Sequence, residues 1–357
     1  ALTEAGAIVV GKTTSPEFAH SLITESPLWG VTRNPWDPAR TPGGSSGGSA
    51  VAVATGCVAL AEGSDMGGSV RIPSAWCGIV GLKPGLGRIP MDVLPGLFDN
   101  LSHHGPLARN VDDARLFLSV TQGPDESDIL SLPDPLELDE PLGADPGELR
   151  IALSVDLGEW AVEPAVEARI RAVADALGRE GAEIVEVDPG LGRREERAWS
   201  DLWAVFMAAY YGHLVDDYRD RMDPQVLVLI ERGQRLSAVE YKQLEFVRTE
   251  MWNRMAPILD SFDVLLCPTM ATGPVPASLS DPGWPDPPDD GRYHSPDMTA
   301  IWNLISPCPV ITVPCGLDDD GMPVGAQLIG PRWREDEVLR VARAIELAIP
   351  PIGHPPI

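Results

Sequence analysis

The 357-residue sequence has little positive charge: Lys and Arg total 27, against 53 for Asp and Glu, which gives a formal net charge of -26. A surface this acidic repels nucleic-acid phosphates and anionic lipid, so we expect neither nucleic acid nor a membrane surface as a partner. No run of about 18 apolar residues predicts a membrane span, and from the first residues we expect no signal peptide.

Cysteine is also scarce, and its spacing fits neither a metal site nor a disulfide framework. The cysteines are odd in number and form no C-x-x-C pair. Each lies in an apolar or Gly/Pro-rich setting, so we expect reduced thiols in the core of a cytoplasmic protein. They are Cys57, Cys77, Cys267, Cys308 and Cys315.

What the sequence does contain is an alternation of strand-like and helix-like segments, which predicts an α/β fold. One β-α-β unit is expected from a strand at 149–155, a helix at 164–180 and a strand at 182–187. Two segments rich in Pro and Asp, 132–148 and 274–298, are expected to be surface connectors. The other expected elements are strands at 7–10, 79–82, 264–266, 310–313 and 324–328, and helices at 51–60, 112–122, 335–348 and through most of 195–260.

The start of the chain has the pattern of a helix end. Residues 1–5 resemble the last turn of a helix, and Gly6 caps it ahead of the strand at 7–10. Because a domain rarely begins on the final turn of its helix, we expect this chain to be part of a longer one.

Two turns rich in Gly and Ser, 43–50 and 63–69, need an explanation. A flexible linker would account for "GGSSGGSA" at 43–50 by composition alone. However, the segment between the two turns is small and apolar, which suits burial. Glycines in such turns let backbone amides approach a ligand and act as hydrogen-bond donors. We therefore favour a binding or catalytic site over a linker.

Two other stretches match known functional motifs, but their structural context does not fit those motifs. "GAIVVGKT" at 6–13 matches a phosphate-binding loop, but its four variable positions form the expected strand itself. "GGSSG" at 43–47 matches a hydrolase nucleophile elbow, but the preceding "NPWDPARTP" cannot be a central strand. The later histidines His103 and His104 are expected in a loop, with surface or structural roles.

From Gly43 to Ser74 the sequence resembles the amidase signature family without a break. The fixed positions are G-G-S-S-G-G at 43–48 and G-S-D-M-G-G-S-V-R-I-P at 63–73. The resemblance implies an α/β fold with a mixed central sheet covered by helices on both faces. It also implies one domain over 1–357 that lacks roughly 100 N-terminal residues. Further similar stretches lie at 11–19, 81–90, 105–109, 263–269 and 306–331.

The resemblance also implies a chemistry, which is hydrolysis of an amide by a serine–cis-serine–lysine triad without cofactor or metal. Ser69 is the implied nucleophile. Ser45, joined to Gly44 by a cis peptide bond, is the implied proton relay. Backbone amides at Met66, Gly67, Gly68 and Ser69 would form the oxyanion hole. The remaining implied site residues are Ser46, Asp65 and Arg71, which support the turns, and Phe18 and Ala19, which line the acyl side of the cleft.

The family's catalytic lysine has no counterpart here, because its position falls before residue 1. Lys12, Lys83 and Lys242 are the only lysines, and none stands at that position. We therefore expect an amidase whose lysine lies upstream of this chain. The alternatives are an inactive fragment or pseudoenzyme that binds acyl compounds, and a glutamine amidotransferase subunit, which the acidic composition disfavours.

The expected partner is a small-molecule amide, and a homodimer is left open. We expect the substrate pocket to be built from 11–20, parts of 195–260 and 274–305. Tyr293 and Trp302 are candidate wall residues, with core packing the favoured role for Trp302.

Overall fold

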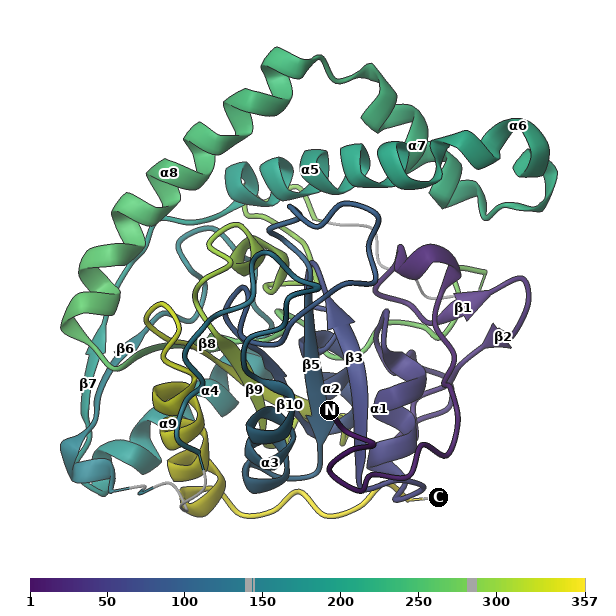
Figure 1. Cartoon of the computed structure of the whole chain (residues 1–357). Coiled ribbons are helices and arrows are strands. Elements are labelled where there is room, and N and C mark those ends of the chain that lie inside the picture. Colours follow the sequence, from purple (N-terminus) through teal and green to yellow (C-terminus); the bar gives the residue numbers. More distant parts are fainter. Residues whose placement is uncertain (139–142, 144, 281–287, 357) are drawn as a thin grey trace.

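The computed structural model describes residues 1–138, 143, 145–280 and 288–356. Its centre is an eight-stranded sheet in the order β3-β5-β4-β9-β10-β8-β6-β7 (Figure 1). Strand β6 runs parallel to β7 and β8, whereas the other neighbours are antiparallel, so the predicted mixed sheet is confirmed. The strands are β3 (Leu60–Asp65), β4 (Val80–Lys83), β5 (His103–Ala108), β6 (Arg150–Leu153), β7 (Glu183–Glu186), β8 (Val264–Pro268), β9 (Val310–Leu317) and β10 (Pro323–Ile329), with β1 (Glu25–Ser26) and β2 (Gly30–Val31) in a separate ribbon.

Helices cover both faces of the sheet, as expected (Figure 1). The helices α1 (Gly47–Ala54) and α2 (Arg71–Cys77) contact each other and one face. The other face is covered by α3 (Val111–Thr121), α4 (Pro164–Arg179) and α9 (Glu335–Ala348). The segment between β7 and β8 forms α5 (Arg193–Tyr211), α6 (Val215–Tyr218), α7 (Pro224–Arg235) and α8 (Ala238–Ser261), of which α5 and α7 pack side by side.

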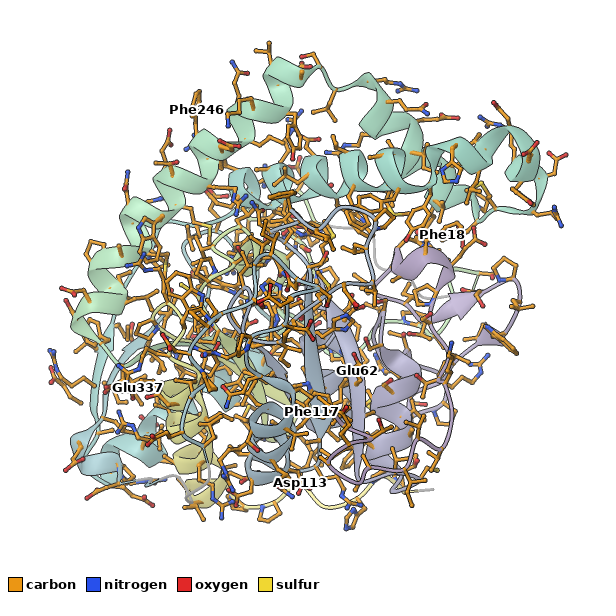
Figure 2. All side chains as sticks on the ribbon, viewed as in Figure 1. Phe18, Glu62, Asp113, Phe117, Phe246 and Glu337 are labelled. Carbon is orange, nitrogen blue, oxygen red and sulfur yellow. The ribbon has the colours of Figure 1, made fainter. Side chains whose placement is uncertain are left out.

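The apolar pattern of each segment explains its place. In α4, Val166, Ile170, Val173 and Leu177 recur on one helical face, and all four are buried against the core. Strands β8 and β10 are buried along their whole length, which suits their central position in the sheet. Figure 2 shows the contrast between the core and the outer helix: Phe117 of α3 is 4% exposed, and Phe246 of α8 is 61% exposed.

Three local predictions are wrong. Residues 7–10 form no strand, and Ile8 and Val10 are 87% and 77% exposed, since no described strand pairs with them. The helix expected at 51–60 is α1, which ends at Ala54, because Gly56 has a φ of +75° and the chain then enters β3. His103 and His104 lie in β5 rather than in a loop, with His103 opposite Asp65.

The expected surface connectors are partly buried. In 274–298, Ala277 and Met298 have no exposed surface and Asp297 is 7% exposed, so a surface location is wrong for these residues. In 132–148, Leu138 is 2% exposed and packs into the core. Residues 139–142, 144 and 281–287 of these two segments lie outside the described residues.

The five cysteines are free thiols, as predicted. Four are buried, but Cys57 is exposed because it follows the end of α1 at the surface. None of the helices in the described ranges has the length and apolar character needed to cross a bilayer.

Candidate active site

The two turns rich in Gly and Ser lie next to each other. The Gly44–Ser45 peptide bond is cis, which confirms that prediction. Directly after it, the Ser46 amide donates a 3.2 Å hydrogen bond to the carbonyl oxygen of Ser69. This bond joins the segment ahead of α1 to the turn between β3 and α2. The hydroxyls predicted to act together therefore sit on neighbouring turns.

Ser45 and Ser69 differ in their access to solvent. Ser45 is 2% exposed, whereas Ser69 is partly exposed and lines a cavity. Within the part of the chain that the structure describes, neither side-chain hydroxyl has a hydrogen-bond partner. Ser69 is thus the serine that a ligand in the cavity can reach, whereas Ser45 is buried and does not line the cavity.

The turn from Met66 to Ser69 carries the backbone amides predicted to bind an oxyanion. The Gly68 amide is not available, because it donates a 2.8 Å hydrogen bond to Asp65 Oδ1. Its inclusion in the predicted oxyanion hole is therefore wrong. The amides of Met66, Gly67 and Ser69 donate to no acceptor among the described residues, and all three residues line the cavity.

A buried ion pair holds this turn in place. Arg71 donates to both oxygens of Asp65, at 2.9 Å from Nε to Oδ2 and 2.8 Å from Nη2 to Oδ1. Arg71 also donates to the carbonyl oxygen of Thr299 and to the side chains of Gln327 and Asn303. Burial by itself would raise the pKa of Asp65, but the Arg71 guanidinium holds that pKa well below its usual range. Both side chains therefore keep their charges and fix the turn geometry.

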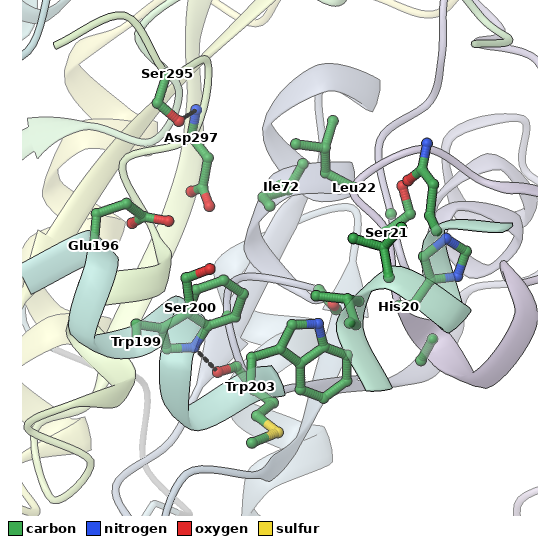
Figure 3. Close-up of a pocket in the computed structure, with 18 of the residues that line it drawn as sticks. His20, Ser21, Leu22, Ile72, Glu196, Trp199, Ser200, Trp203, Ser295 and Asp297 are labelled. Carbon is green, nitrogen blue, oxygen red and sulfur yellow. Dashed lines mark hydrogen bonds between the residues drawn. The ribbon is translucent and has the colours of Figure 1, made fainter. Parts of the chain in front are cut away.

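The cavity beside Ser69 has a volume of about 570 Å³ (Figure 3). Its walls come from residues 19–22, from Gly44, from the turn at 66–72, from α5 and α7, and from 295–297. Each of the three segments expected to build the pocket, 11–20, 195–260 and 274–305, contributes lining residues. Trp302 has no exposed surface and packs in the core, as favoured. Ala19 lines the cavity, as predicted.

Two predicted wall residues lie elsewhere. The ring of Phe18 stacks on Tyr211, with centroids 4.2 Å apart, and faces a neighbouring hollow instead of the cavity. Phe18 and Ala19 have φ values of +49° and +57°, which are uncommon for residues other than glycine. Tyr293 likewise lines a separate hollow, beside Glu196 and Arg193.

Sequence reasoning placed parts of 195–260 in the pocket but did not identify the residues that α5 contributes. Glu196, Trp199, Ser200 and Trp203 all line the cavity. Their spacing of three and four residues places them on one helical face, so the signal was present in "ERAWSDLW". The indole of Trp199 donates a 2.7 Å hydrogen bond to the Met66 carbonyl, the dashed line in Figure 3. Helix α5 thereby contacts the oxyanion turn directly.

A second missed feature is a pair of carboxyl groups, Glu196 and Asp297, that point toward each other at one end of the cavity (Figure 3). Burial raises the pKa of Asp297 to about 6, although hydrogen bonds from Thr299 oppose the shift. Burial, followed by repulsion from Asp297, raises the pKa of Glu196 well above its ordinary value. Thr299 Oγ1 also bonds to the Gly67 carbonyl at 2.7 Å, which links this pair to the oxyanion turn.

No lysine of the chain contacts the two serines. Lys12 is exposed, and Lys242 is exposed and pairs with Glu245. Lys83 is fully buried, but its Nζ donates to the carbonyl oxygens of Pro84 and Cys308. Burial, with repulsion from Arg71, lowers the pKa of Lys83 to about 7. The described residues contain no group of three or more His, Cys, Asp or Glu side chains placed to hold a metal ion.

Comparison with known proteins identifies relatives that match over almost the whole chain. The family model described as Amidase matches residues 1–339. An acylamidase of Rhodococcus erythropolis is 37% identical over 98% of this chain and 74% of its own length. One component of a glutamyl-tRNA(Gln) amidotransferase from Synechococcus is 34% identical, over 99% of this chain and 77% of its own. The solved structure of a bacterial aryl acylamidase of the amidase signature family superposes with a TM-score of 0.90 at 30% identity, covering 97% of this chain and 74% of that one.

Proposed function

This chain belongs to the amidase family of hydrolases acting on C–N bonds, and on that premise we propose that it cleaves a carboxylic amide through an acyl-enzyme on Ser69. The observation that carries the proposal is the position of Ser69. It lines the cavity on a turn with unpaired amides, next to the cis Gly44–Ser45 bond.

The proposed reaction begins with attack of Ser69 Oγ on the amide carbon. Its proton passes to the hydroxyl of Ser45, which gives its own proton to a base. The amides of Met66, Gly67 and Ser69 stabilise the negative charge that develops on the carbonyl oxygen, and one such donor is typically worth about 3 kcal/mol in the transition state. The base then returns the proton through Ser45 to the departing amine, and the C–N bond breaks. Water releases the acyl group from Ser69 by the same relay.

The base that completes the relay is not one of the three lysines of this chain. Lys12 and Lys242 are exposed, and Lys83 is held by two carbonyl oxygens away from Ser45. Serine is a weak nucleophile without an adjacent base, so a further proton acceptor has to reach Ser45 for turnover. If no such acceptor reaches Ser45, the alternative is that the chain binds acyl compounds without hydrolysing them.

A fluorophosphonate probe tests the nucleophile. Ser69 Oγ would form a bond to phosphorus as fluoride leaves, and peptide mass spectrometry would locate the adduct. We expect labelling at Ser69, no labelling in Ser69→Ala, and much slower labelling in Ser45→Ala. Ser119→Ala, which alters an exposed hydroxyl on α3, is the matched control. An adduct on another serine, or full labelling of Ser69→Ala, would overturn the assignment.

Turnover is tested separately with an aryl amide whose released amine absorbs light. Amine release at a constant rate, absent in Ser69→Ala, would support the full cycle. Labelling of Ser69 without amine release would support the alternative of acyl binding without turnover.

A further inference from the structure

The carboxyl pair of Glu196 and Asp297 has no role in the reaction proposed above. We propose that this pair binds a positively charged ammonium group of the substrate, so that the chain prefers cationic amides to neutral ones. This inference rests on the proposed function, since it concerns the substrate of the same cavity.

The first support is an unpaired buried oxygen. Glu196 Oε2 is shielded from solvent and accepts no hydrogen bond from any described residue. A buried carboxylate oxygen without a donor is costly, so a donor supplied by a ligand would offset that cost. Figure 3 shows the Glu196 side chain reaching from α5 toward Asp297 at the end of the cavity.

The second support is the arrangement of Asp297. Its Oδ1 accepts a 2.5 Å hydrogen bond from the backbone amide of Thr299 and also lies 2.5 Å from Thr299 Oγ1. Its own amide donates to Ser295 Oγ at 3.3 Å. One oxygen and the backbone are therefore fixed, while Oδ2 has no hydrogen-bond partner among the residues described. The side chain is held in position with one oxygen free to accept from a ligand.

The third support is that no surrounding cation among the described residues forms an ion pair with Glu196 or Asp297. Arg71, whose charge reaches Asp297, is hydrogen-bonded to Asp65. Arg193 donates to the Arg292 carbonyl, and Arg232 pairs with Asp201. Neither carboxyl of the pair forms an ion pair with a described residue. Arg71 acts on Asp297 through its charge and Arg197 lines the same hollow as Glu196, but no described cation lies within ion-pair distance of either carboxyl.

The aromatic wall of the cavity fits the same ligand. Trp199 and Trp203 stack nearly parallel, with ring centroids 6.3 Å apart and an interplanar angle of 14°. Indole faces attract ammonium groups and pack against the methylene chain that carries them. A ligand with an amide at Ser69 and an ammonium at the carboxyl pair would lie along this wall.

The same two groups favour an ammonium over two other ligands. A metal ion usually requires at least three protein ligands of this type, and the pair supplies two. A neutral amide could bond to a carboxyl pair that shares one proton, but it would leave the negative charge uncompensated. An ammonium supplies both the hydrogen-bond donors and the missing charge.

Binding to the Ser69→Ala protein tests the proposal without hydrolysis. The probes are a short series of ω-ammonio alkanamides, each paired with the alkanamide in which a methyl group replaces the ammonium. Calorimetry would give the ratio of the two dissociation constants for each pair. We expect the best cationic amide to bind about tenfold or more tightly than its neutral partner, the usual effect of one charged hydrogen bond.

The variant Glu196→Gln keeps the shape of the side chain and removes its charge, and we expect it to reduce the ratio to near one. Asp175→Asn, which removes an exposed carboxylate on α4, controls for net charge and should leave the ratio unchanged. Equal binding of the paired probes, or an unchanged ratio in Glu196→Gln, would overturn the cation site. Absence of fluorophosphonate labelling at Ser69, with the ratio intact, would count against the nucleophile instead.

Discussion

The indole of Trp199 on α5 donates a 2.7 Å hydrogen bond to the carbonyl oxygen of Met66 in the turn that precedes Ser69. This bond fixes one peptide plane of the turn, because a carbonyl and the next amide rotate together. The next amide is that of Gly67, one of the three proposed to bind the oxyanion. A helix from the middle of the chain therefore sets the direction of a catalytic donor.

The Trp199–Met66 bond predicts that Trp199→Phe slows phosphonylation of Ser69 about fivefold. The reason is the loss of one hydrogen bond worth about 1 kcal/mol, with the aromatic wall retained. The measurement is the second-order rate of fluorophosphonate labelling. Trp203→Phe is the matched control, since its indole forms no hydrogen bond to a described residue. Equal slowing in both variants would point to cavity shape and not to the bond.

The absence of a side chain at Gly67 is a second requirement of the turn. A Cβ atom added to Gly67 would lie 2.2 Å from Trp199 Cζ2, so the turn or the indole would have to move. We expect Gly67→Ala to slow labelling about a hundredfold and to lower the free energy of unfolding by about 1–3 kcal/mol. Gly11→Ala, where an added Cβ meets nothing, should match the parent protein. A normal labelling rate in Gly67→Ala would show that the Gly67 amide does not act as an oxyanion donor.

The buried pair of Asp65 and Arg71 predicts a stability effect that depends on pH. The folded-state pKa of Asp65 is depressed, so its contribution is present above the ordinary carboxyl range and is lost as pH falls below about 4. We expect Asp65→Asn to cost about 3–5 kcal/mol at neutral pH, because Arg71 is left as an unpaired buried charge. Urea unfolding at several pH values measures this. A cost that does not shrink in acid would contradict the charge argument.

The carboxyl pair predicts the opposite pH dependence. Asp297 has its pKa raised to about 6, so this group stabilises the folded protein below pH 4, and that contribution is lost as pH rises through 6. The charged and titratable groups beside Glu196 are Tyr293, Arg193, Arg197, Asp201 and Arg232. Those near Asp297 are Arg71 and Asp65.

We therefore expect Glu196→Gln to raise the free energy of unfolding by about 1–2 kcal/mol at pH 8 and to have little effect at pH 4. Thermal unfolding at the two pH values is the measurement. Glu180→Gln, at the exposed end of α4, is the control. A variant less stable than the parent at pH 8 would show that Glu196 makes a favourable contact in the free protein.

Local sequence was sufficient wherever the structure depends on a periodic apolar pattern. The expected helix at 335–348 matches α9 residue for residue, and the β-α-β unit between residues 149 and 187 is present as β6, α4 and β7. The strand expected at 7–10 is absent, because an apolar run becomes a strand only where another strand pairs with it.

The sequence by itself determined which turns form the candidate site. The glycines and serines at 43–50 and 63–69, through their resemblance to the amidase signature, predicted both the cis Gly44–Ser45 bond and the place of Ser69 beside it. Such turns need residues without side chains, and that requirement can be read along the chain. Only the tertiary structure showed that the Gly68 amide donates a hydrogen bond to Asp65, and that the carboxyl groups of Glu196 and Asp297 face each other in the cavity. Those contacts depend on how the chain packs, and no local pattern specifies which carboxyl will face which.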